Sequence, residues 1–136
     1  MNFRFAFASA ALAAFSMSGI ARADDKLKYE DLVHCAAITN VVVGVLSLDG
    51  GATKNKAQID LFNSQATALQ VIAAVSASKD AKLVLADTSK EVDVIVAVLG
   101  DKDKEKSKSF IETEVPKCKT LGAAALEVVN DAKSSK

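Results

Sequence analysis

The chain has few of the residues that most often carry chemistry. Its 136 residues include no tryptophan, one tyrosine, one histidine, one proline and two cysteines. A second histidine for a zinc or copper site therefore does not exist. No G-x-S-x-G, H-E-x-x-H, Walker A or G-x-G-x-x-G string occurs, and the covalent haem motif C-x-x-C-H is also absent. The sequence thus predicts no catalytic residue, no cofactor and no metal ligand, and a protein that is not an enzyme.

The amino-terminal 23 residues have the pattern of a secretory signal peptide. Arg4 is followed by an apolar run rich in alanine and phenylalanine, and an A-x-A cleavage site ends at Ala23. The run is shorter than the about 20 residues that a membrane span needs, although an uncleaved anchor is the alternative. We expect a signal peptide over 1–23, one domain over 24–136 without a membrane span, and a periplasmic or secreted mature protein that begins at Asp24.

The charge of this mature part argues against a nucleic-acid partner. Residues 24–136 hold 15 lysines and 17 acidic residues, a net charge of −2 (15 − 17), and both arginines lie before Asp24. The guanidinium groups that clamp phosphate are therefore absent from it, and a slightly negative chain does not attract a polyanion. Its only aromatic residues are Tyr29, Phe62 and Phe110, so the core must consist mainly of Ala, Val, Leu and Ile.

Four apolar segments with helical spacing follow the signal pattern. They run from about Lys26 to Leu48, from Thr53 to Ser78, from Asp80 to Leu99 and from Ser109 to Lys133. Because the connections between them are short, the fold class that we expect is all-α: a small antiparallel four-helix bundle. The β-branched stretches 41–48 and 92–100 would also fit strands, so a mixed α/β domain is the alternative.

Three local features refine this prediction. Gly100 is placed to cap the end of the third helix. The mixed-charge run over 101–108 is typical of a solvated turn or of the exposed start of the next helix. Pro116 should kink or restart the fourth helix, because proline removes a backbone donor and crowds the preceding turn.

Cys35 and Cys118 are expected to form a disulfide bond. Two cysteines in a secreted chain of this size usually pair, and both lie on the apolar stripe of their helix. In antiparallel neighbours their heights differ by about five residues, or roughly 7–8 Å. Whether they pair within one chain stays open. The alternative is a reactive or intermolecular thiol at Cys118, because a helix restarting at Pro116 and two flanking lysines would favour the thiolate.

His34 directly precedes Cys35, but their side chains should diverge. At about 100° per residue Cys35 falls on the apolar stripe and His34 falls away from it, so a nucleophilic Cys–His pair is not expected. We expect His34 to be a surface or partner-facing residue, and a pH-sensing role stays open. Carboxylate pairs sit among lysines, as on solvated helix faces, and nothing in the sequence singles out two that face each other across a cleft. Examples are Glu30–Asp31, Glu91–Asp93 and Glu112–Glu114.

The function that best fits these observations is a small exported helical protein without enzymatic activity. It would act as a protein-interaction or stress-related binding module in the cell envelope. In size and in its two distant cysteines, though in no motif, it resembles small helical periplasmic acid-stress chaperones. The alternative is a carrier of a small apolar ligand held between the helices, and a third hypothesis is a redox-active or otherwise cryptic enzyme. The partner is an unknown envelope protein or a small apolar ligand, and the oligomeric state stays open.

Overall fold

The computed structural model describes residues 28–135, so the predicted signal peptide lies outside the described residues. Within this range the chain is helical and contains no strand. The elements are α3 (Tyr29–Leu46), the 3₁₀ turn η2 (Leu48–Gly50), α4 (Gly51–Lys54), α5 (Lys56–Ser76), α6 (Ala81–Leu99) and α7 (Lys104–Ser134). The all-helical prediction is confirmed, and the two β-branched stretches lie mainly in α3 and α6.

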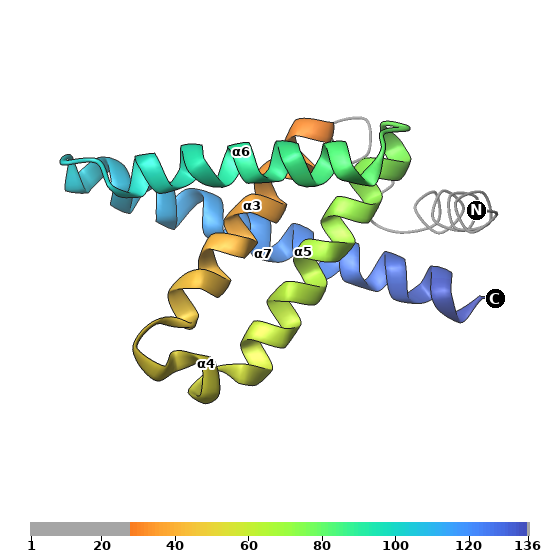
Figure 1. Ribbon diagram of the computed structural model, residues 1–136, viewed down its shortest axis with the longest axis horizontal. Coiled ribbons are helices and arrows are strands. Elements are labelled where there is room, and N and C mark those ends of the chain that lie inside the picture. Colours follow the sequence, from red (N-terminus) through yellow and green to blue (C-terminus); the bar gives the residue numbers. More distant parts are fainter. Residues whose placement is uncertain (1–27, 136) are drawn as a thin grey trace.

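The helices are arranged as a pair crossed by two others (Figure 1). Helices α3 and α5 lie side by side and are joined through α4. Helix α6 begins at the end of α5 and crosses in front of α3, and α7 crosses behind both, so α3 packs against α5, α6 and α7. The predicted antiparallel four-helix bundle is therefore not confirmed, because α6 and α7 cross the α3/α5 pair instead of lining up with it.

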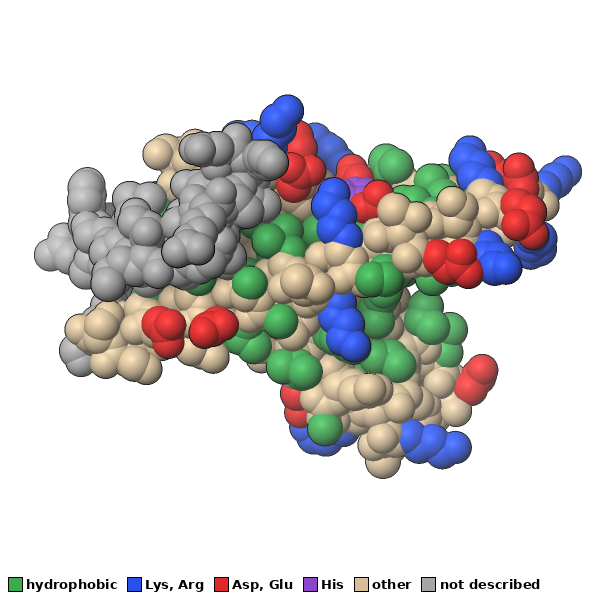
Figure 2. All heavy atoms as spheres, turned by 180° about the vertical axis from the view of Figure 1, so that it is seen from behind, with side chains coloured by type: hydrophobic (Ala, Val, Ile, Leu, Met, Phe, Trp, Pro, Cys, Tyr) green, Lys and Arg blue, Asp and Glu red, His purple; other side chains and the backbone are tan. Residues whose placement is uncertain are grey.

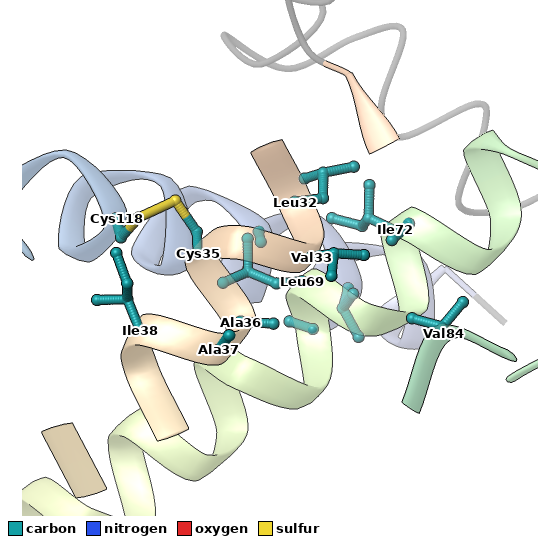
Figure 3. Packing of buried hydrophobic residues seen from close by; sticks show 14 of the residues in the cluster. Leu32, Val33, Cys35, Ala36, Ala37, Ile38, Leu69, Ile72, Val84 and Cys118 are labelled. Atoms are coloured by element: carbon teal, nitrogen blue, oxygen red, sulfur yellow. A yellow bond between two sulfur atoms is a disulfide. The ribbon is translucent and has the colours of Figure 1, made fainter. Parts of the chain in front are cut away.

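The core forms where the helices cross, and it is built from small and aliphatic side chains, as the composition indicates. Ala36, Ala37 and Ala73 are completely buried, and side chains this small let helix backbones approach closely. Leu69 and Val84 fill the remaining space and are also fully buried (Figure 3). Close packing of this kind makes each core position sensitive to a change in volume.

A disulfide bond between Cys35 and Cys118 joins α3 to α7 across this core (Figure 3). The two Cα atoms are 4.8 Å apart, and each residue is only 1% exposed. The predicted pairing is therefore present, and it lies within one chain. Closing a loop of 83 residues stabilises the fold by roughly 4 kcal/mol in the chain-entropy model.

The ends of the helices follow from local side-chain chemistry. Asp80 precedes α6 and its carboxylate accepts the backbone N–H of Lys82 at 2.8 Å. Asp103 precedes α7 in the same way and accepts two backbone N–H groups of the first turn. Carboxylates are favoured at this position because the first N–H groups of a helix have no partner within it. Gly100 follows α6 as predicted, although its φ of −84° is right-handed.

Helix α7 is longer than the sequence pattern indicates. It begins at Lys104, so most of the charged run forms its exposed first turns. It also continues through Pro116 without a break, so the expected restart does not occur. The argument for a thiolate at Cys118 from a nearby helix N-terminus therefore has no support in the structure.

The end of the α3/α5 pair at α4 lies away from α6 and α7 (Figure 1). Apolar side chains are exposed here, among them Val45 at 60% and Leu48 at 64%. By length and composition alone, α3 could cross a membrane, with a mean hydropathy of 1.3 over 18 residues. A core helix passes the same test, and the first half of α3 belongs to the core described above.

Candidate functional site

A groove of about 560 Å³ opens where the first half of α3 meets α6 and α7. Most of its lining is charged. Its carboxylates are Glu30, Asp31, Asp87, Glu91 and Glu114, its ammonium groups are Lys79, Lys90 and Lys117, and the remaining residues are Tyr29, Val33 and His34. Figure 2 shows red carboxylates next to the purple histidine. The groove therefore combines five negative groups with three positive ones around a single imidazole.

The first cluster in the groove is formed by His34, Glu91 and Glu114, which we call the histidine clasp. Nδ1 of His34 lies 2.6 Å from Oε1 of Glu91 on α6, and its Nε2 lies 3.4 Å from Oε2 of Glu114 on α7. The hydrogen bond to Glu91 and the contact with Glu114 thus tie α3 to α6 and α7.

The disulfide explains why the clasp forms. It fixes Cys118 beside Cys35, which is the neighbour of His34 in the chain. Glu114 lies four residues before Cys118, and residues four apart share one face of a helix. Phe110, another turn back, meets the His34 ring edge-on, with centroids 6.1 Å apart and planes at 83°.

These contacts add to the expectations from the sequence. The side chain of His34 is only 26% exposed, and each of its ring nitrogens faces a carboxylate. Glu91 and Glu114, which the sequence did not single out as a pair, both contact this histidine. The predicted divergence of His34 from Cys35 agrees with the structure, in which the cysteine sulfur is bonded to Cys118.

The second cluster, which we call the tyrosine cup, consists of Tyr29, Asp87 and Lys79. The Tyr29 hydroxyl donates a hydrogen bond of 2.7 Å to Oδ2 of Asp87 on α6. Nζ of Lys79, from the turn between α5 and α6, lies 3.8 Å from the centroid of the Tyr29 ring and 3.7 Å from the same carboxylate oxygen. The ammonium group is therefore held between an aromatic face and a carboxylate.

The surroundings of Tyr29 in the cup change the pKa of its hydroxyl. Burial raises the pKa of Tyr29 from 10.0 to about 12, together with the hydrogen bond to Asp87 and the negative charges of Asp87 and Glu30. All three causes disfavour the phenolate. The cup thus holds a neutral phenol that donates to Asp87, leaving the negative charge of the carboxylate available to a cation.

The residues of both clusters were not identified as a site from the sequence. Tyr29 and Asp87 lie 58 residues apart, and His34 and Glu91 lie 57 apart, so no short motif joins them. The predicted Cys35–Cys118 bond was one available signal. It places Glu114, one turn before Cys118, next to His34, the neighbour of Cys35. The predicted disulfide residues themselves lie in the core and do not line the groove.

The described lining of the groove offers charged side chains for binding. Among residues 28–135 no group of three or more His, Cys, Asp and Glu side chains is arranged to hold a metal ion. In the clasp, both ring nitrogens of His34 are directed at carboxylates instead of presenting a lone pair to a metal. Serine, threonine and cysteine side chains are missing from the described lining, and the hydroxyl of Tyr29 in this lining donates to Asp87.

Comparisons with known proteins give no further guide to the site. No protein-family model matches the chain, and neither a curated protein nor a solved structure shows significant similarity to it.

Proposed function

We propose that this protein is a small exported binding module without catalytic activity, and that its groove receives part of another protein of the cell envelope. Export is proposed from the signal pattern that ends at Ala23. The buried disulfide supports it, because such bonds persist in oxidising compartments outside the cytosol.

The observation that carries the proposal is the charge held in the groove by three helices and a turn. Glu30, Lys90 and Lys117 line it without an ion-pair partner in the part of the chain that the structure describes. Unpaired charges of both signs around a groove favour a partner with a complementary pattern and disfavour others. The disulfide and the clasp link the helices that carry these charges, which lowers the entropy lost on binding.

The groove fits a protein surface better than a small apolar ligand. A site for such a ligand is mostly apolar and encloses most of its surface, whereas this groove is open and mostly charged. A second hollow of about 290 Å³ between α5 and α7 has a mixed lining, in which Ala68, Leu126 and Val129 stand beside five polar residues. The redox alternative has less support, because the two cysteines are bonded to each other and buried.

Capture of partners from the envelope fraction tests the proposal with a matched pair of variants. Lys117 lines the groove, and Lys119 lies exposed two residues away on α7 outside it. We expect the wild-type protein and Lys119→Glu to enrich the same envelope protein after mild crosslinking. Lys117→Glu should reduce this enrichment at least about tenfold, as expected when a buried interfacial charge meets one of like sign. Circular dichroism would show that both variants remain folded.

Two results would contradict the proposal. One is that no protein is enriched by the wild type, and the other is that Lys117→Glu and Lys119→Glu behave alike. Thermal melts against a panel of lipids and metabolites test the carrier alternative, because a true ligand raises the melting temperature by mass action. Amino-terminal sequencing of the recovered protein tests export, with Asp24 expected as the first residue.

A further inference from the structure

We propose that the tyrosine cup is a receptor for a lysine side chain of the partner, and that Lys79 is its built-in occupant. This inference rests on the proposed function and specifies the chemistry of the partner. The cup already holds an ammonium group, with Nζ of Lys79 at 3.8 Å from the Tyr29 ring centroid and 3.7 Å from Oδ2 of Asp87. An aromatic face together with a carboxylate is a recurrent way of binding organic cations.

The groove around the cup favours a positive ligand. Five carboxylates and three lysines line it, so an excess of two negative charges remains while His34 is neutral. When Lys79 leaves the cup, five carboxylates face two lysines. Glu30 lies close enough to act on the Tyr29 hydroxyl. Of the two remaining lysines, Lys90 lies three residues after Asp87. Its positive charge repels a cation at the cup and limits the affinity of the cup for that cation.

The present occupant is held loosely enough to be replaced. Lys79 lies in the turn between α5 and α6, next to Ser78 with a positive φ of 52°. Its side chain is 41% exposed and that of Asp87 is 35% exposed. Ion pairs with this exposure contribute little to stability. A lysine of a docked protein can therefore take the same position while Lys79 turns out into solvent.

The structure provides a direct reporter for this exchange. Tyr29 is the only tyrosine of the chain, and no tryptophan is present, so near-ultraviolet absorbance of tyrosine reports the cup alone. The probe is a Gly-Lys-Gly peptide blocked at both ends. We expect it to change the Tyr29 absorbance in a saturable manner, and the same peptide with an acetylated lysine side chain to have no effect.

Removing the occupant should improve binding. Lys79→Gln is expected to bind the lysine peptide about three- to tenfold more tightly than the wild type, which corresponds to Lys79 filling the cup in about two thirds to nine tenths of the molecules. Lys82→Gln makes the same change of charge three residues away, outside the groove, and should leave the affinity unchanged. Asp87→Asn should abolish binding in both the wild-type and the Lys79→Gln background.

The inference is overturned if Lys79→Gln binds no more tightly than Lys82→Gln, or if the acetylated peptide changes the absorbance as much as the lysine peptide does. Its failure can be told apart from failure of the proposed function. If partner capture depends on Lys117 but the peptide does not bind, the cup inference alone is wrong. If the peptide binds as expected but capture does not depend on Lys117, the proposed function is wrong and the cup stands.

Discussion

The histidine clasp and the tyrosine cup lie in one groove, but they are built on different supports. The clasp joins three helices, and its histidine is the neighbour of a cysteine bonded to α7. The cup joins the first residue of α3 to α6 and to a lysine from a turn. The clasp contacts thus lie beside a covalent link between two helices, whereas the cup contacts, which we propose to be exchangeable, depend on a lysine from a turn.

This difference assigns separate roles to the two clusters. Changes near the clasp should lower the stability of the fold, because they loosen the contacts among α3, α6 and α7. Changes in the cup should alter binding and leave stability nearly unchanged. The variants below are ordered from the largest expected effect on stability to the smallest, and each one tests whether this separation holds.

Loss of the disulfide should have the largest effect. Cys35→Ser and Cys118→Ser are each expected to lower the free energy of unfolding by about 2–5 kcal/mol, the usual loss for a native disulfide in a small secreted domain. The double variant should cost little more than either single one, because both remove the same bond. Denaturant unfolding measures these values. Full additivity, or a free thiol in the unreduced wild-type protein, would contradict the assignment.

Removal of the clasp histidine should have a smaller but clear effect. We expect His34→Ala to cost about 1–2 kcal/mol, because Glu91 and Glu114 lose their shared donor while remaining partly buried. Glu112→Gln is the control, since this exposed carboxylate lies outside the clasp, and it should change stability by less than about 0.5 kcal/mol. A double-mutant cycle of His34→Ala with Glu91→Gln should show a coupling free energy between the two side chains. Its absence would mean that their contact does not stabilise the fold.

The cup should be visible in an alkaline titration. The pKa of Tyr29 is raised from 10.0 to about 12 in the folded protein. The contribution of the neutral phenol to the free energy of unfolding is therefore fully present below pH 10. It is lost as the pH rises from 10 to about 12, since the unfolded chain releases the phenolic proton first. Absorbance of tyrosinate follows this single group directly. Asp87→Asn should lower the pKa of Tyr29, and an unchanged titration would show that the hydrogen bond contributes nothing.

Replacement of the occupant lysine should have the smallest effect on stability. Lys79→Gln removes an exposed ion pair and a contact with an aromatic ring, so the free energy of unfolding should change by less than about 1 kcal/mol. Thermal and denaturant unfolding beside Lys82→Gln provide the comparison. A loss as large as that of His34→Ala would show that Lys79 is a structural part of the groove and not an exchangeable occupant.

The sequence predicted the parts of this protein that depend on local pattern. Apolar spacing located α3, α5 and α6 to within a few residues, and the count of cysteines indicated the Cys35–Cys118 bond. It did not predict that α6 and α7 cross the α3/α5 pair, because helical spacing says which face is buried but not at what angle helices pack. The two clusters depend on that crossing. Glu91 and Asp87 look like ordinary solvated carboxylates until α6 lies across the start of α3.

The most direct test of the central claim, that the groove is where a partner binds, is site-specific photocrosslinking in the cell envelope. A photoreactive residue in place of Lys90 lies in the groove, and one in place of Lys108 lies exposed on α7 outside it. We predict that position 90 crosslinks to one envelope protein and that position 108 does not crosslink to that protein. Equal crosslinking from both positions, or crosslinking from position 108 alone, would contradict the account.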